Sequence, residues 1–273
     1  MIPVRSVAKA MTIAGSDSGG GAGIQADLKT FAAHGVYGTS VVTAVTAQNT
    51  ETVMAIAEVP EEVVALQIDA VMEDIGADAI KTGMLSAASI VEVVVDRLEA
   101  WGAKNLVVDP VMVSKSGHTL LADNAVRALA TKLLPMATAV TPNVLEAQIL
   151  ARRSITSVAD AEEAARAIAQ LGATFVVVKG GHLEGADAVD VIFDGSAIHH
   201  LSVERVNTEN THGTGCTFAS AIAAQLALGE EPMVTIERAK RYLTAALRSS
   251  YAIGAGHSPV HHLFALDAAA NAR

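Results

Sequence analysis

The chain has 273 residues, of which 51% are hydrophobic and only 3% aromatic, so a large core must be built from alanine and branched aliphatic side chains. The net charge is −10 and the sequence contains no basic cluster, which argues against nucleic acid as a partner. The single cysteine excludes an internal disulfide framework and a CxxC zinc site. No apolar stretch is long enough for a secretion signal or a membrane span, so we expect a cytoplasmic protein without a membrane partner.

The predicted elements alternate between strands and helices. In chain order we predict a strand at 10–15, a helix at 24–34, strands at 37–48 and 53–59, a helix at 61–75, a strand at 79–85, a helix at 86–101, a strand at 105–112, a helix at 122–137, a strand at 139–143, helices at 145–151 and 158–171, a strand at 174–179, a hairpin at 189–193 and 198–205, and two closing helices at 214–228 and 233–251. Such alternation implies right-handed βαβ units. We therefore predict an α/β fold in a single domain over residues 1–273. Its central sheet is doubly wound, mostly parallel and flanked by helices, with a small β flap from strands 37–59 at one edge.

Polar or glycine-rich segments lie at or near the carboxyl ends of many of the predicted strands. They are Gly15-Ser16-Asp17, Gln48-Asn49, Lys81-Thr82-Gly83, Asp109-Pro110, Thr141-Pro142-Asn143 and Lys179-Gly180-Gly181-His182. In open α/β sheets, ligands bind beyond the carboxyl ends of the strands. Each segment alone could be an ordinary strand end, but six of them at one rim of the sheet favour a binding site there.

A polar segment, 210–216, runs straight into the apolar stretch 217–228 and predicts a loop that opens a buried helix. The first backbone N–H groups of a helix lack intrahelical partners and lie at its positive end. Gly213, Thr214, Gly215 and Cys216 could therefore direct several donors at one anion. The alternative is a glycine-rich helix start with an inert, buried cysteine.

Three side chains at or just beyond predicted strand ends are candidates for binding. Gln48 carries a planar amide that could pair with an aminopyrimidine edge, or it could simply cap its strand. Asp109 and Glu146 suit Mg²⁺, which takes few protein ligands and keeps waters and phosphates. The alternative for Glu146 is a capping box with Asn143 as the first residue of a helix.

Two further motifs are weaker. Residues 21–26 match the pattern G-x-G-x-x-A of dinucleotide-binding proteins, but the motif lies too far from its strand, and the next strand ends in Gln48 instead of an acidic residue. A dehydrogenase is therefore an outside alternative. Residues 114–118, SKSGH, could form a lid over a site or an ordinary surface connection.

Taken together, these segments resemble the ribokinase-like superfamily, and within it the hydroxymethylpyrimidine/phosphomethylpyrimidine kinases of thiamin biosynthesis. The resemblance is carried by AGSDSGGGAGIQAD at 14–27, TAQNT at 46–50, KTGM at 81–84, VDPVM at 108–112, TPNVLEA at 141–147, VKGGH at 178–182 and THGTGCT at 211–217. They follow one another in order over nearly the whole chain. One departure is Ser258, which stands where the family's G-x-G-H-G-P motif has glycine.

The resemblance implies ATP-dependent phosphorylation of 4-amino-5-hydroxymethyl-2-methylpyrimidine and then of its monophosphate. The roles it implies are pyrimidine recognition by Gln48; a substrate pocket lined by Gly15, Asp27, Met84 and Val111; an anion hole from Gly213 to Cys216; nucleotide binding by Lys179 and Thr211; and Mg²⁺ binding by Asp109 and Glu146. It also implies a small-molecule substrate and a homodimer formed through the flap.

Cys216 stands where the sugar kinases of this superfamily have an aspartate base. We expect the helix N-terminus to lower the pKa of its thiol from about 8.5, so that the thiolate could accept the proton of the substrate hydroxyl. Pyridoxal kinases of this family carry a second cysteine on the lid, whereas this sequence has Ser114 there, which predicts weak or absent pyridoxal phosphorylation. A non-catalytic ligand sensor on the same fold is the third alternative.

Overall fold

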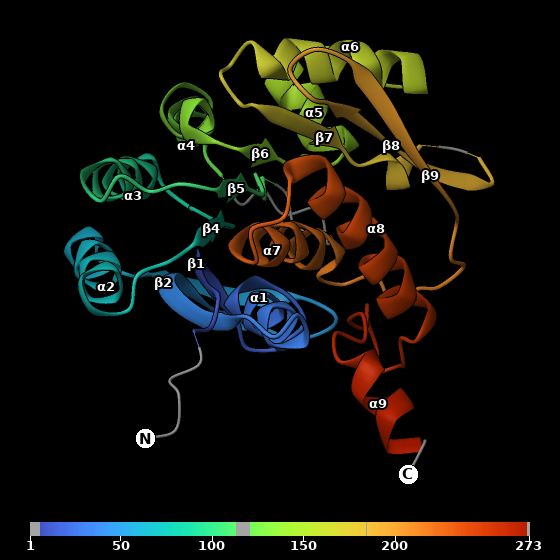
Figure 1. Ribbon diagram of the computed structural model, residues 1–273, viewed down its shortest axis with the longest axis horizontal. Coiled ribbons are helices and arrows are strands. Elements are labelled where there is room, and N and C mark those ends of the chain that lie inside the picture. The colour runs from blue at the N-terminus through green and yellow to red at the C-terminus, as the bar shows by residue number, and fades with distance from the viewer. Residues whose placement is uncertain (1–5, 113–120, 184, 272–273) are drawn as a thin grey trace.

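The computed structural model describes residues 6–112, 121–183 and 185–271, and within them nine strands form one sheet with helices on both faces (Figure 1). The strands are β1 (Lys9–Asp17), β2 (Tyr37–Gln48), β3 (Val53–Glu58), β4 (Ala79–Thr82), β5 (Leu106–Val108), β6 (Ala139–Val140), β7 (Phe175–Val178), β8 (Asp187–Phe193) and β9 (Ile198–Glu204). The α-helices are α1 (Gly23–Ala33), α2 (Glu61–Asp74), α3 (Ala88–Ala100), α4 (Asp123–Ala128), α5 (Val144–Ala151), α6 (Val158–Ala169), α7 (Thr214–Ala227), α8 (Pro232–Arg248) and α9 (Phe264–Asn271).

The sheet has the strand order β3-β2-β1-β4-β5-β6-β7-β8-β9. In this order, the six neighbouring strands β2, β1, β4, β5, β6 and β7 are parallel to one another. At the two edges, β3 and the β8–β9 hairpin run antiparallel to their neighbours. The chain moves from β1 to β2 on one side and later returns to β4 on the other side of β1. This reversal makes the carboxyl ends of β1 and β4 the topological switch point, where such sheets bind ligands. The predicted doubly wound, mostly parallel sheet is therefore confirmed.

Each face of the sheet has its own apolar core, because successive side chains of a strand point to opposite faces. On β1, Met11 and Ile13 pack against the core covered by α2 to α6, whereas Ala10 packs against the core covered by α1, α7 and α8. Figure 1 shows these two groups of helices on opposite sides of the sheet. Burial on both faces explains why the central strands are almost continuously apolar in sequence.

Three local expectations are wrong. The strand predicted at 105–112 ends at Val108, because Pro110 offers no N–H to the ladder and Val111 has a left-handed φ of 43°. The helix predicted at 122–137 is α-helical only to Ala128 and continues as a π turn and a 3₁₀ turn, since Pro135 interrupts its hydrogen bonding. A short helix, α9, follows the two helices that were expected to close the chain.

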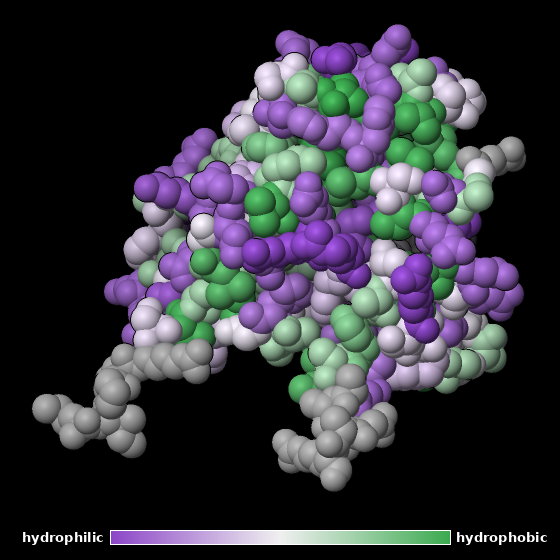
Figure 2. All heavy atoms as spheres, turned by 45° about the vertical axis from the view of Figure 1, so that its right-hand side comes forward, coloured by the Kyte–Doolittle hydropathy of each residue, from purple (hydrophilic) through white to green (hydrophobic). Residues whose placement is uncertain are grey.

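The surface mixes both kinds of side chain: Figure 2 shows hydrophilic and apolar residues interspersed over one face of the molecule. Among the described residues, none of the helices combines the length and the apolar character needed to cross a lipid bilayer.

Candidate active site

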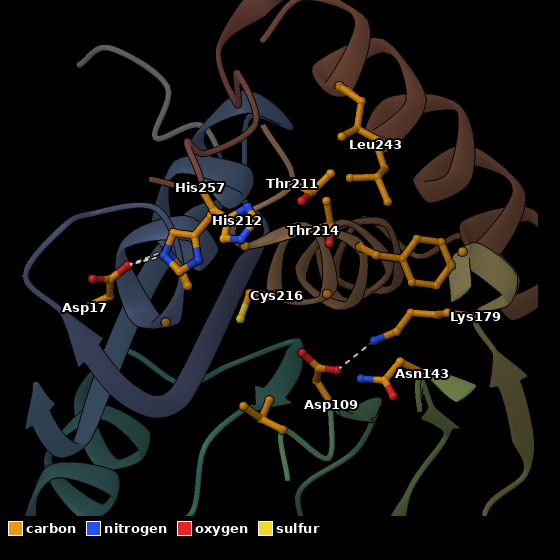
Figure 3. Close-up of a pocket in the computed structure, with 18 of the residues that line it drawn as sticks. Asp17, Asp109, Asn143, Lys179, Thr211, His212, Thr214, Cys216, Leu243 and His257 are labelled. Carbon is orange, nitrogen blue, oxygen red and sulfur yellow. Dashed lines mark hydrogen bonds and ion pairs between the residues drawn. The ribbon is translucent and has the colours of Figure 1, made fainter. Parts of the chain in front are cut away.

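A cavity of about 620 Å³ lies at the switch point, between the carboxyl ends of the parallel strands and the N-terminus of α7 (Figure 3). Nearly all the predicted site residues line it: Gly15, Gln48, Met84, Asp109, Val111, Glu146, Lys179, Thr211, Gly213, Thr214, Gly215 and Cys216. They come from seven separate segments of the chain, and the parallel topology brings them to one rim, as the six strand-end motifs predicted.

The residue that caps the N-terminus of α7, Gly213, must be glycine. Gly213 has a left-handed φ of 74°, and a Cβ there would lie 1.8 Å from the carbonyl oxygen of Gly21. The N–H of Thr214 donates to the Thr211 carbonyl at 3.4 Å, so it is partly used within the loop. The N–H groups of Gly215 and Cys216 belong to the first turn and have no helical partner by position. These two donors, fewer than predicted, remain available for the predicted anion hole.

A partly buried cation, Lys179, faces those donors. Lys179 Nζ lies 3.1 Å from Asp109 Oδ1, and a Cβ on Gly215 would lie only 3.2 Å from the same Nζ. Burial alone would lower the pKa of Lys179, but the negative charges of Asp109 and Glu146 raise it above its usual value. The ammonium therefore stays charged beside the anion hole, where it can neutralise a phosphate.

Glu146 forms the capping box that was one of its two predicted roles. Its carboxylate accepts hydrogen bonds from the backbone N–H of Asn143 at 2.8 Å and of Met112 at 3.2 Å, and its own N–H donates to the Asn143 side chain at 3.0 Å, a capping box. The carboxylate also lines the cavity. Burial raises the pKa of Glu146, Lys179 lowers it and Asp109 raises it, with a net increase.

Gln48 is the last residue of β2 and lines the same cavity. Its Oε1 accepts from Thr46 Oγ1 at 3.2 Å, and its Nε2 lies 3.5 Å from His212 Nε2. The amide therefore keeps hydrogen-bonding capacity toward the cavity. Beside it, Gly15 is required by close packing, because a Cβ there would lie 2.6 Å from Cε of Met84.

The sequence analysis gave no role to a network centred on Asp17. Its carboxylate accepts from the backbone N–H groups of Gly19, Gly21 and Ala22 at 2.8–3.0 Å and lies 2.9 Å from His212 Nε2. Burial raises the pKa of Asp17. The hydrogen bonds from His212 and Ala22 and the charge of His212 lower it by more than burial raises it, so the pKa lies below its usual value. The glycines that follow Asp17 are a local signal for such a turn, whereas its distant histidine partner leaves none.

The sequence analysis also did not identify a buried ion pair that lines the cavity between β8 and α8. Lys240 Nζ lies 2.7 Å from Asp190 Oδ2, and Asp190 Oδ1 accepts from the Gly180 N–H at 3.0 Å. Both side chains line the cavity. The pair therefore ties α8 to the backbone that follows Lys179.

The expectation that Asp27 lines the substrate pocket is wrong. Asp27 is fully buried behind the cavity wall, where its carboxylate accepts from Lys81 Nζ at 2.9 and 3.0 Å, from Thr12 Oγ1 at 2.6 Å and from Ser220 Oγ at 2.6 Å. These four bonds occupy its oxygens. Lys81, its partner, is the residue of the pair that lines the cavity.

The expected direction of the Cys216 pKa is also wrong. The thiol is buried, and burial raises its pKa to about 11, opposed by the positive charge of Lys81 and by a hydrogen bond from the backbone N–H of Gly23. The cost of burying a charge outweighs the helix N-terminus. Figure 3 shows the sulfur between the Asp17–His212 pair and the Asp109–Lys179 pair. The predicted lid at 114–118, with Ser114, lies outside the described residues.

Comparisons with known proteins identify the family of the chain. A family model described as phosphomethylpyrimidine kinase matches residues 17–261. The hydroxymethylpyrimidine/phosphomethylpyrimidine kinase of Rhizobium meliloti is 50% identical over 256 residues, covering 93% of this chain and 96% of that protein. The thiamine biosynthesis bifunctional protein ThiED of Geobacter sulfurreducens is 51% identical over 94% of this chain, which spans about half, 52%, of that longer protein.

Solved structures of related kinases share the fold of this chain. A Bacillus subtilis pyridoxal kinase in an ADP complex superposes with a TM-score of 0.89 at 39% identity, covering 96% of this chain and 100% of that one. A phosphomethylpyrimidine kinase from Clostridium difficile has a TM-score of 0.79 at 44% identity, covering 89% of this chain and 100% of that one. The fold is therefore ribokinase-like, and the chain belongs to the phosphomethylpyrimidine kinase family, whose members are phosphotransferases.

Proposed function

We propose that this enzyme phosphorylates 4-amino-5-hydroxymethyl-2-methylpyrimidine and then its monophosphate, as a step of thiamin biosynthesis in the cytoplasm. The observation that carries the proposal is the shared cavity, which is lined both by an amide suited to an aminopyrimidine, Gln48, and by the N-terminus of α7 with Lys179. Relatives of 50% identity named as hydroxymethylpyrimidine/phosphomethylpyrimidine kinases support the substrate class.

As a kinase, the enzyme uses ATP. In our proposal Lys179 and the N–H groups of Gly215 and Cys216 hold the transferring phosphoryl group, with Thr214 and Thr211 in the loop beside them. These donors are fixed before the substrate binds, so they stabilise charge in the transition state without reorganisation. Gly213 keeps the loop close enough to Gly21 for this geometry.

Asp109 and Glu146 fit Mg²⁺. Both carboxylates are buried and line one cavity, and the negative charge of Asp109 contributes to the raised pKa of Glu146, so a cation between them would relieve their repulsion. The described residues contain no group of three or more histidine, cysteine or acidic side chains suited to a metal, so in our proposal these two carboxylates are the protein ligands. When bound, Mg²⁺ would neutralise phosphate charge during transfer.

The substrate pocket is formed by Gly15, Met84, Val111 and Gln48. With the pyrimidine held there, the hydroxymethyl oxygen would face Cys216 and the anion hole. The proton of the hydroxyl passes to the Cys216 thiolate, the oxygen forms a bond to the γ-phosphorus, and the bond from that phosphorus to the β-phosphate oxygen breaks to release ADP. Positioning and charge stabilisation supply most of the rate in such transfers, so a thiol that is only partly ionised suffices.

We further propose that residues 1–273 act as a single domain and that two copies pair through the flap. Met54 and Ile56 on β3 are 68% and 44% exposed, and Leu66 on the adjacent α2 is 65% exposed, an apolar edge that a second copy would cover. Sedimentation velocity tests the dimer. Exchange of Met54 and Ile56 for glutamate should yield monomers, and an unchanged dimer would exclude this edge as the interface.

An ADP-release assay with MgATP tests the activity. The pyrimidine alcohol, its monophosphate and pyridoxal are offered separately, and we expect turnover of both pyrimidines. Pyridoxal kinase is the second candidate because solved pyridoxal kinases share the fold at 39% and 36% identity, but the chain has one cysteine and lacks a second thiol. Turnover of pyridoxal alone would overturn the proposal, and no turnover at all would favour a ligand sensor.

A further inference from the structure

The ion pair between Lys81 and Asp27 is buried directly behind the reacting thiol. Both side chains have an exposed fraction of 0%, and the Nζ–Oδ2 distance is 2.9 Å. Thr12 and Ser220 donate to the two carboxylate oxygens at 2.6 Å each. A fully buried charge pair is costly to desolvate and adds little net stability over apolar packing, so a role beyond the core is worth seeking.

Helical periodicity places this pair next to Cys216. Ser220 follows Cys216 by four residues on α7, so the two side chains share one face of that helix, one turn apart. Asp27 likewise follows Gly23 by four residues on α1, and the Gly23 N–H is hydrogen-bonded to the Cys216 sulfur. The carboxylate therefore lies one turn behind the thiol on both helices. Lys81 approaches from β4 and, unlike Asp27, lines the cavity together with Cys216.

Four charged groups face Cys216 from the elements packed around it: Asp27 from α1, Lys81 from β4, Asp109 after β5 and Lys179 after β7. Lys81 makes the largest favourable contribution to the thiolate, ahead of the unfavourable contributions of Asp27 and Asp109. Two hydrogen bonds to Asp27, at 2.9 and 3.0 Å, hold the Lys81 ammonium in place. Desolvation favours the neutral amine, but the charge of Asp27 keeps Lys81 protonated and raises its pKa.

We propose that Lys81 is a positioning residue for catalysis, whose ammonium, held by Asp27, is the counter-charge of the Cys216 thiolate. Its consequence for turnover rests on the proposed function, because it acts through the base that takes the substrate proton. Its effect on the thiol does not, because the thiolate can be measured in the resting protein. The N-terminus of α7 alone does not offset the cost of burying the charged thiolate. A fixed positive charge beside the sulfur offsets part of the remaining cost.

The test is the rate at which iodoacetamide alkylates Cys216, the sole cysteine, in the full chain at pH 7.5 with EDTA. Alkylation follows the thiolate fraction. Because a charge a few ångströms away shifts a pKa by about one to three units, Lys81→Met should slow alkylation at least about tenfold and Asp27→Asn should speed it at least about tenfold. Lys81→Arg, which retains the charge, should remain much closer to wild type than Lys81→Met.

The opposite signs separate this role from a structural one. Both single substitutions break the same ion pair, so mere loosening would expose the thiol and speed alkylation in both; that outcome would overturn the inference. Lys240→Met is the matched control, since it breaks another buried pair that lines the cavity, with Asp190 at 2.7 Å, and should leave alkylation within about twofold. A tenfold change in that control would also refute the specific role of Lys81.

Should a single variant fail to fold, the double variant Lys81→Met/Asp27→Asn buries no unpaired charge. It should still be alkylated more slowly than wild type, because the contribution of Lys81 exceeds that of Asp27, and an equal or faster rate would contradict the inference. Turnover is measured separately. Wild type that phosphorylates no pyrimidine would refute the proposed function, whereas active wild type with same-sign alkylation changes would refute only the role of Lys81.

Discussion

Exchange of Cys216 for alanine should affect the two phosphorylations unequally. The substitution removes the sulfur but keeps the backbone N–H at position 216, so the anion hole is preserved. The first substrate reacts through a hydroxyl that must lose a proton. The second reacts through a phosphate oxygen that is already ionised at pH 8, because the second pKa of a phosphate monoester is about 6.

The size of the effect follows from the removed base. General base catalysis contributes a factor of about 10² to 10⁴, so kcat with the alcohol should fall at least about a hundredfold. The monophosphate step should fall less than about tenfold, and KM should change little in either case, because the sulfur contributes mainly to the transition state.

The pH dependence gives an independent check. Burial raises the pKa of Cys216 to about 11, so its basic form is scarce at neutral pH and increases as the pH rises. At pH 8 about one thiol in a thousand is ionised, and kcat with the alcohol should therefore rise about tenfold per pH unit between pH 7 and 9. This slope should disappear in Cys216→Ala.

The assay is coupled ADP release at saturating MgATP, with each pyrimidine varied in turn, and Cys216→Ser serves as a control of similar volume whose hydroxyl is a far weaker base. A near-normal kcat with the alcohol would refute the role of the thiol. Equal losses in both steps would refute the argument that only the alcohol requires a base and would assign Cys216 to positioning.

Further expected outcomes concern recognition, the anion hole, the metal and specificity. Gln48→Leu should lower kcat/KM for both pyrimidines about tenfold to a hundredfold, through lost hydrogen bonds worth about 1–3 kcal/mol, and unchanged kinetics would exclude pyrimidine recognition by this amide. Gly213→Ala should lose at least about 1–2 kcal/mol of unfolding free energy from its left-handed backbone alone, besides the clash with Gly21 at 1.8 Å; an unchanged Tm and kcat would contradict this. EDTA should abolish turnover, and Asp109→Asn should raise the Mg²⁺ concentration for half-maximal rate at least about tenfold, as a titration of activity against Mg²⁺ would measure. Pyridoxal should be turned over at least about a hundredfold more slowly than the pyrimidine, because the aldehyde meets no second thiol; comparable rates in the same ADP-release assay would contradict this.

The sheet and the rim of the site were predictable because they depend on local patterns. Runs of β-branched residues predict strands, and the rule that parallel sheets bind at their carboxyl ends gathers motifs as distant as Gly15 and Lys179 at one cavity. The pairing of Asp17 with His212 was not predictable, because nothing in either segment indicates which distant loop will contact it.

Two errors had physical causes that sequence patterns understate. Asp27 precedes Phe31 by four residues and so lies on the buried face of α1, a position that requires a partner for its charge and rules out open contact with a substrate. For Cys216 the helix N-terminus was visible in the sequence, but the extent of burial was not, and burial decides the direction of its pKa.

Asp17 and His212 are 195 positions apart, and the backbone N–H of His212 in turn donates to the carbonyl of Ser258 at 3.0 Å. During synthesis a chain emerges from its N-terminus at about 5–20 residues per second, so the loop after β1 leaves the ribosome many seconds before its partner. Strands of the sheet can pair in that interval, whereas the wall of the cavity is complete only when the segment around Ser258 has emerged. We therefore expect a nascent chain to complete its cavity only when nearly all of it has been translated.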